Sequence, residues 1–276
     1  MDRQLLAVPV IIAINVLVFL AWQAIRYVDG LGKVMVENFL VSTAHLFGGV
    51  INLIDDYVHQ LEGGAWWTLL TAAFSHNELW HIALNMFVLW SFGTVLERLW
   101  GIRVFVVFYI TAAIVASASH CFVSSVLMGN PSITALGASG AVSGLLLAFA
   151  LMFPKHKILV FGVIPIPALI GALAFVAIDL WGLFAQTQGG GIGIGHGAHL
   201  GGALCGFIFW ASYLRTRFKR PTAGDSFQMA MTPADVQEFQ RLRQKLDHEG
   251  PDALTPKEKV FLEQIRERVM QAHQQR

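Results

Sequence analysis

The chain is short of charged residues and of cysteine. Asp, Glu, Lys and Arg together make up only 13% of its 276 residues, whereas 55% are hydrophobic. Soluble domains average about 25% charged residues, so this composition argues against a soluble domain and predicts a membrane protein. A formal net charge of +1 gives no support to a nucleic-acid partner. The two cysteines lie in apolar runs, which argues against a disulfide framework.

Long apolar runs fill most of the first 214 residues. A helix needs about 20 residues to cross a bilayer, and six stretches are candidates, the fourth of them shorter than the rest: Leu6–Ile25, Leu79–Leu96, Val104–Val126, Ser139–Phe153, Ile158–Phe184 and Gly195–Leu214. We therefore predict an all-α polytopic membrane protein whose six-helix domain covers residues 1–218. No small-residue cleavage site follows the first stretch, so we interpret it as a retained anchor.

The basic residues lie beside alternate gaps between these stretches. They follow the second, fourth and sixth stretches, at Arg98, Arg103, Lys155, Lys157, Arg215 and Arg217. The positive-inside rule places such gaps in the cytoplasm. We predict a multi-pass protein of the cell (inner) membrane with both termini cytoplasmic, in which the second, fourth and sixth helices all begin on the outer side.

The polar C-terminal part, residues 219–276, is predicted to be a cytoplasmic linker followed by a helical hairpin. The segments "TPAD" from Thr232 and "TPKE" from Thr255 each offer a Thr N-cap, a Pro at the first helical position and an acid at the third. Gly250 between them is a stop signal. We expect the two helices to pack through Val236, Phe239, Leu246, Phe261, Ile265 and Val269. The tail carries no chemical motif, and its partner is unknown.

Four polar residues within the apolar stretches fall at one depth under this topology. His81 and Asn85 lie near the start of the second helix, Ser139 opens the fourth, and His199 follows the start of the sixth. Polar groups inside a membrane are costly and predict function. A neutral imidazole can activate a serine hydroxyl as a nucleophile, so Ser139 and His199 are the candidate catalytic pair. His81 and Asn85 share one helix face and could stabilise an oxyanion.

Small residues explain how the two helices of this pair could meet. Gly202 and Gly206 share a face with His199, and the fourth helix offers a face of Ser139, Gly140, Ser143 and Gly144. Small-residue faces let transmembrane backbones approach closely. Packing of these two faces would bring the Ser139 hydroxyl to the His199 imidazole.

Other polar residues have plainer interpretations. We expect His76 to make a structural hydrogen bond near the second helix. Asp179 could orient His199, but it falls near the outer end of its helix, where we expect it to meet water. His196 and His199 could form a metal pair, yet no carboxylate or cysteine accompanies them at useful spacing. We therefore predict no metal and no cofactor.

These residues resemble the rhomboid family of intramembrane serine proteases. The matching motifs are "GASG" around Ser139, "HNELWHIALN" with His76, His81 and Asn85, "AHLGG" around His199, and "WTLLTAAFSH" before the second helix. The resemblance implies a six-helix bundle with a Ser139–His199 dyad and an oxyanion site at His81 and Asn85. It also implies single-pass transmembrane proteins as substrates and the lipid bilayer as surroundings. A proton-coupled transporter and a non-catalytic rhomboid-like binding protein are the alternatives.

Overall fold

The computed structural model describes residues 5–25, 27–52, 58–160, 163–190, 193–217, 232–250 and 253–274. The chain divides into two compact units, Met1–Arg217 and Phe218–Arg276, and each is described here by itself. The predicted linker that begins at residue 219 falls on residues 218–231, which lie outside the described residues.

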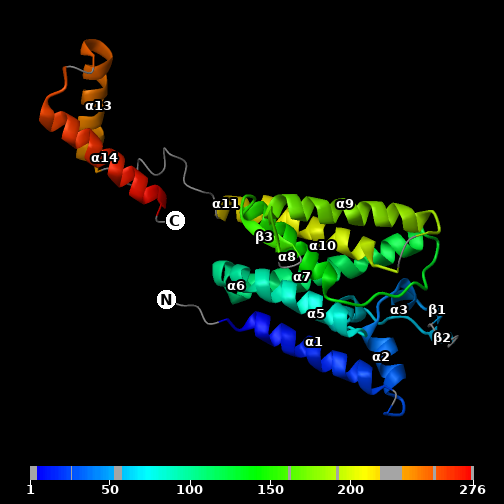
Figure 1. Cartoon of the computed structure of the whole chain (residues 1–276). Coiled ribbons are helices and arrows are strands. Elements are labelled where there is room, and N and C mark those ends of the chain that lie inside the picture. The colour runs from blue at the N-terminus through cyan, green and yellow to red at the C-terminus, as the bar shows by residue number, and fades with distance from the viewer. Residues whose placement is uncertain are drawn as a thin grey trace. The chain divides into compact units, whose positions relative to one another are not determined.

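The first unit is a bundle of helices that run roughly alongside one another (Figure 1). Its long helical segments are α1 (Ala7–Ala24), α5 (Leu79–Val88) continued by the π-helical turn η2 (Leu89–Gly93) and α6 (Thr94–Trp100), α7 (Ile102–Phe122) continued by η3 (Val123–Leu127), α8 (Ser139–Met152), α9 (Ala168–Thr187), and α10 (His196–Phe209) continued by η4 (Trp210–Leu214) and α11 (Arg215–Arg217). The helical membrane bundle that the composition predicts is therefore confirmed.

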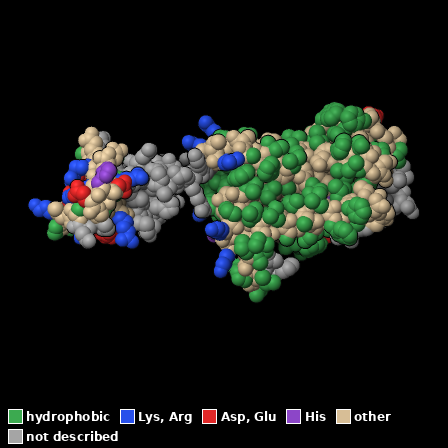
Figure 2. Space-filling view, turned by 90° about the horizontal axis from the view of Figure 1, so that it is seen from above, with side chains coloured by type: hydrophobic (Ala, Val, Ile, Leu, Met, Phe, Trp, Pro, Cys, Tyr) green, Lys and Arg blue, Asp and Glu red, His purple; other side chains and the backbone are tan. Residues whose placement is uncertain are grey.

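Five of these segments are long and apolar enough to cross a membrane, and α8 is a shorter apolar helix. Hydrophobic side chains cover most of the face of the bundle seen in Figure 2, and Lys and Arg gather at one end of it. Exposed large hydrophobic residues such as Leu17, Phe87 and Trp181 lie on α1, α5 and α9. This outer surface suits contact with lipid rather than water.

The fifth apolar stretch is not one helix, which corrects the predicted span Ile158–Phe184. Its first part forms an antiparallel hairpin of β3 (Lys157–Val160) and β4 (Ile164–Pro167), and α9 begins only at Ala168. Pro165 and Pro167 explain the difference, because proline lacks the N–H that a helix interior needs and clashes with the preceding turn. Pro167 fits as the N-cap residue of α9, where the missing N–H costs nothing.

The long segment between α1 and α5 folds against one end of the bundle (Figure 1). It contains α2 (Leu31–Phe39), α3 (Thr43–Phe47), a hairpin of β1 (Gly49–Asn52) and β2 (Val58–Leu61), α4 (Thr68–Thr71) and the 3₁₀ turn η1 (Ala72–Phe74). Val41 pairs with Ala135 through backbone hydrogen bonds of 3.0 and 2.8 Å. The segment thereby holds the chain that leads into α8.

Helix α8 packs closely on α10 at the centre of the unit, as the small-residue faces predict. A Cβ added at Gly202 would overlap the carbonyl group of Gly140, and one added at Gly206 would overlap that of Gly144. In the opposite direction, a Cβ at Gly144 would lie 2.7 Å from the carbonyl oxygen of Gly202. Only glycine allows backbones to approach this closely.

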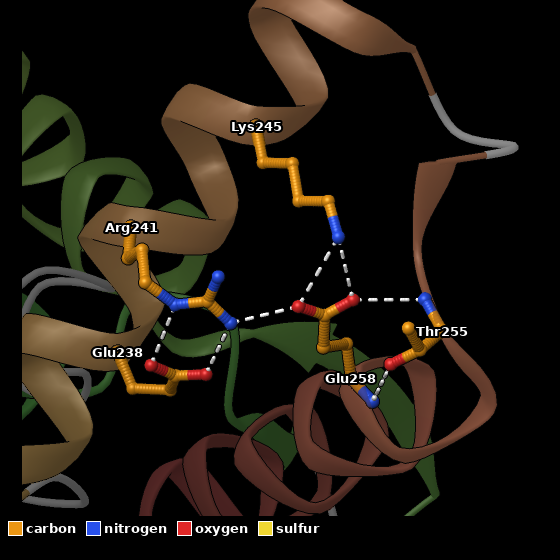
Figure 3. A network of polar contacts seen from close by, with 5 residues as sticks. All are labelled: Glu238, Arg241, Lys245, Thr255 and Glu258. Carbon is orange, nitrogen blue, oxygen red and sulfur yellow. Dashed lines mark hydrogen bonds and ion pairs between the residues drawn. The ribbon is translucent and has the colours of Figure 1, made fainter.

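The second unit contains the predicted helix pair, α13 (Pro233–Glu249) and α14 (Pro256–Gln274). Thr232 and Asp235 form a capping box at the start of α13, and Gly250 follows its end with φ of 83°. Glu258 joins the two helices through ion pairs to Arg241 at 2.7 Å and Lys245 at 3.0 Å (Figure 3). Ile265 is buried, as predicted, and so is Leu242, which the prediction left out. The side chain of Val269 lies outside the described residues.

Candidate active site

Ser139 is the first residue of α8, at the end of a turn built on glycine. Gly137 has φ of 122°, and a Cβ there would lie 2.8 Å from Cε1 of His81. Both the backbone conformation and this close approach require glycine. The turn is fixed by hydrogen bonds from the N–H of Gly137 to the carbonyl of Ala72 and from the N–H of Ala138 to Nε2 of His76. His76 therefore makes the structural hydrogen bond that its position predicts.

His199 reaches Ser139 from α10. Its Nε2 lies 2.8 Å from the Ser139 Oγ, which is within the range for a nucleophile and its base. The two side chains come from helices that lie 60 residues apart in sequence and meet through the glycine contacts described above. The ring of Phe175 on α9 stacks on the His199 imidazole with a centroid distance of 5.5 Å. The structure thus brings together the two residues that the sequence singles out as a catalytic pair.

Asp179 is buried, and this corrects the expectation that it meets water. Only 3% of its surface is exposed, and its Oδ1 lies 2.9 Å from Nδ1 of His199 and 2.7 Å from Nδ1 of His196. A carboxylate accepts hydrogen bonds, so both imidazoles donate from Nδ1. That tautomer leaves Nε2 of His199 free to accept the proton of the Ser139 hydroxyl.

The expectation that no carboxylate accompanies His196 and His199 is wrong, because Asp179 lies beside both. Their ligand atoms all lie within 4.8 Å of one another. A zinc ion with ligands at about 2.0 to 2.2 Å in tetrahedral geometry keeps ligand atoms roughly 3.4 Å apart. The separations of 2.7 and 2.9 Å instead match charge-assisted hydrogen bonds. The arrangement therefore fits two hydrogen bonds from the histidines to Asp179 better than it fits a bound metal ion.

His81 and Asn85 lie on the same side of the site, on α5. The ring of His81 packs on Gly137 and meets that of His76 edge to face, with centroids 4.8 Å apart. Asn85 is buried and donates from Nδ2 to the carbonyl of His81 at 3.0 Å. Both residues line the same cavity as Ser139 and His199. The first backbone N–H groups of α8 also lie at Ser139, where a helix leaves N–H groups without partners in its own hydrogen-bond ladder.

A cavity of about 1190 Å³ surrounds these groups, between α5, α7, α8, α9, α10 and the loops at one end of the bundle. Apolar side chains such as Leu84, Leu146 and Phe175 form much of its wall. The cavity also reaches His120 of α7, which the sequence interpretation missed. Its Nε2 lies 3.0 Å from the carbonyl oxygen of Ile133, so it helps to hold the segment before Ser139. A histidine within an apolar span was the available signal.

Comparison with known proteins adds the family. The family model described as "Rhomboid domain" matches residues 63–216, which is more than half of the chain. The chain belongs to the rhomboid family. The matched region includes all of the motifs quoted above, since the first of them starts at Trp67 and the last ends at Gly202.

Three rhomboid relatives illustrate the similarity. Rhomboid protein 1, mitochondrial, of Saccharomyces cerevisiae is 38% identical over 146 residues, covering 51% of this chain and 40% of the yeast protein. RHOMBOID-like protein 12, mitochondrial, of Arabidopsis thaliana is 28% identical, covering 74% of this chain and 57% of its own length. Presenilin-associated rhomboid-like protein, mitochondrial, of Homo sapiens is 31% identical, covering 74% and 47%. The chain therefore spans less than two thirds of the length of each of these relatives.

Proposed function

We propose that this rhomboid-family chain is an intramembrane serine protease that cleaves transmembrane segments of single-pass membrane proteins. The observation that carries the proposal is the 2.8 Å contact between Nε2 of His199 and Oγ of Ser139. A serine hydroxyl is a weak nucleophile until a positioned base takes its proton. Family membership alone supports a rhomboid-type membrane protein, so the chemistry is proposed from this contact.

In the proposed reaction, Ser139 Oγ attacks the carbonyl carbon of the scissile peptide bond while His199 takes the hydroxyl proton. The negative oxygen of the tetrahedral intermediate is held by backbone N–H groups at the start of α8, with His81 and Asn85 as side-chain donors. His199 then gives its proton to the leaving amine. A water molecule in the cavity hydrolyses the acyl-enzyme, again with His199 as the base.

The surroundings of the site support a membrane-embedded substrate. The cavity wall is largely apolar, and the helices around it present hydrophobic side chains outward. A hydrophobic peptide segment can therefore reach Ser139 without leaving an apolar environment, while polar groups near Ser139 accommodate its backbone. No cofactor takes part in the proposed reaction.

The location is a separate part of the proposal. We propose that the chain resides in the cell (inner) membrane with both termini in the cytoplasm, because exposed Arg98, Arg103, Lys155 and Arg215 lie at the ends of membrane segments that the positive-inside rule assigns to that side. The three relatives are named as mitochondrial, so a mitochondrial inner membrane is the competing location. Fractionation and protease protection of a terminal tag distinguish the two locations and the orientation.

A serine-reactive fluorophosphonate and a fluorogenic transmembrane peptide test the chemistry with purified full-length protein in detergent. We expect labelling and cleavage by the wild type and neither by Ser139→Ala. His199→Ala should lose cleavage and most labelling. Ser212→Ala is the matched control, because this exposed serine on η4 donates a hydrogen bond to the carbonyl of Ile208 in its own helix. A Ser139→Ala variant that cleaves at the wild-type rate would overturn the proposal, and an unlabelled, inactive wild type would favour a rhomboid-like binding protein.

A further inference from the structure

One face of α9 contacts two histidines of α10. Phe175, Asp179 and Gly182 follow one another at helical spacing. Phe175 stacks on His199, Asp179 binds both histidines, and Gly182 makes room for the His196 ring, which a Cβ at this position would overlap. Three consecutive positions of one helix face thus serve two imidazoles.

This arrangement needs a reason beyond packing. Asp179 is the one ionisable residue in α9, and an acid inside a membrane span is expensive and marks a functional group by default. The buried residues of α9 are otherwise the two alanines Ala168 and Ala172. An apolar side chain at position 179 would fill the space at lower cost.

We propose that Asp179 and His196 together position His199 as the base of the reaction. The inference rests on the proposed protease function. Asp179 accepts the Nδ1–H of His199, which fixes the tautomer whose Nε2 faces Ser139, and its negative charge balances the imidazolium that forms when His199 takes the serine proton. His196 donates to the same Oδ1, so the carboxylate is held from two sides. Asp179 and His196 act through His199 and are positioning residues.

The charges around His199 agree with this role. Asp179 faces it from α9, His196 from its own helix, and Ser139 from α8. His81 faces it from α5 across the cavity. Asp179 is therefore the group among these that can stabilise a positive His199, since the other neighbours are neutral or can themselves become positive.

Kinetics of the full-length protein in detergent test the proposal. Asp179→Asn keeps the size and one acceptor oxygen but removes the charge, so we expect kcat to fall on the order of 10² to 10⁴-fold while KM stays within about twofold. Asp179→Glu should recover part of that loss, because it restores the carboxylate. His196→Gln and Gly182→Ala, which keep the Asp179 and His199 side chains themselves unchanged, should each lower kcat about 3- to 30-fold, because a less firmly held carboxylate misplaces the base. Ile178→Val, at an exposed neighbour of Asp179, is the matched control and should retain wild-type kinetics.

A second readout separates positioning from simple stabilisation of the fold. NMR of protein labelled with ¹⁵N-histidine reports the tautomer, and comparison with His199→Gln assigns the signal of His199. We expect the Nδ1–H form in the wild type and a mixture of tautomers in Asp179→Ala. Wild-type kcat in both Asp179→Asn and His196→Gln, beside an inactive Ser139→Ala, would overturn the positioning role and leave the protease assignment standing. If the wild type cleaves nothing, the tautomer still decides: an unchanged His199 signal in Asp179→Ala contradicts the proposal.

Discussion

The carboxylate of Glu97 accepts the backbone N–H of Ala7 at 2.8 Å and so joins the end of one membrane segment to the beginning of another. Its two oxygens also accept the N–H groups of Leu6 and Val8, at 2.8 and 2.9 Å. Helix α1 has no side-chain cap from its own N-cap residue. A negative charge at this place supplies the missing acceptors and interacts favourably with the helix dipole.

Replacing this acid should loosen α1. Glu97→Gln removes the charge and one of the two acceptor oxygens, and a hydrogen bond to a charged group contributes about 1.5 to 3 kcal/mol. We expect a lower melting temperature in detergent, with kcat nearly unchanged for the folded fraction, because Glu97 lies outside the candidate site. Glu62→Gln, at an exposed acid, is the control. Equal melting temperatures for all three proteins would show that the cap does not stabilise the bundle.

The proposed oxyanion donors make a second prediction. Asn85→Ala and His81→Ala leave Ser139 and His199 in contact but remove one donor each. Loss of one oxyanion donor costs about 10² to 10³ in kcat in a soluble serine protease, and we expect a fall in kcat of up to this size with labelling of Ser139 retained. Wild-type turnover by both single variants would remove these residues from the oxyanion site and leave the backbone N–H groups of α8 to hold the charge.

The helices of the bundle could be predicted because the length of each apolar run can be read directly from the sequence. The β3–β4 hairpin could not, since Ile158–Pro167 is as apolar as a span and its prolines were weighed less than its hydrophobicity. The strand and helix content of the segment between α1 and α5 was not predicted either. There the order comes from contacts with distant residues, such as the pairing of Val41 with Ala135.

The candidate site was predictable where small residues and polar residues shared a helix face. Ser139 and His199 could be paired because Gly202 and Gly140 indicated which helices meet. Asp179 was misjudged because it was placed by its distance from Phe184, the predicted outer end of the span, whereas α9 continues to Thr187. Contacts with His196 and His199 of α10, which spacing along α9 does not reveal, bury its carboxylate. The direction of a side chain on a helix also depends on packing that spacing alone does not determine.

The ion pairs of the tail make a prediction about pH. Hydrogen bonds from the Thr255 N–H, Arg241 and Lys245 lower the pKa of Glu258 from its ordinary value of 4.5 to about 2. A lowered pKa means that the folded hairpin favours the ionised form, so this contribution to stability is present above about pH 4.5 and is lost as the pH falls towards 2. We expect pepsin to cleave within residues 232–274 faster, relative to an unstructured reference peptide, as the pH falls through this range.

Two variants isolate that effect. Glu258→Gln should be cleaved faster than the wild type at pH 4.5 and should show a smaller further change towards pH 2. The remaining change comes from Asp235, because hydrogen bonds from Thr232 and Arg268 lower its pKa to about 2 as well. Glu263→Gln is the matched control, because Glu263 is exposed on the same helix and pairs with Arg266 of that helix at 3.0 Å. If Glu258→Gln and the wild type keep the same relative rates at every pH, Glu258 does not hold the two helices together.

The contact between α8 and α10 makes the last prediction. A side chain at Gly202 would overlap the backbone of Gly140, one residue after the proposed nucleophile, so Gly202→Leu must push the helices apart and separate His199 from Ser139. Misplacement of reacting groups by about 1 Å can cost on the order of 10²-fold in rate. We expect at least that loss of kcat together with a lower melting temperature, because close packing is a main source of helix association in lipid.

Gly202→Ala tests the same separation of the helices with a smaller side chain. Its single methyl group still meets the Gly140 carbonyl, so a smaller loss of kcat and of melting temperature should follow. Ile208→Leu is the control, since Ile208 is exposed on the same helix and a leucine there meets only the surroundings. Cleavage rate and melting temperature are measured for the three variants in one detergent. If Gly202→Leu cleaves as fast as the wild type, α10 does not need to approach α8 along this face, and the Ser139–His199 contact cannot depend on the glycines that the sequence places beside it.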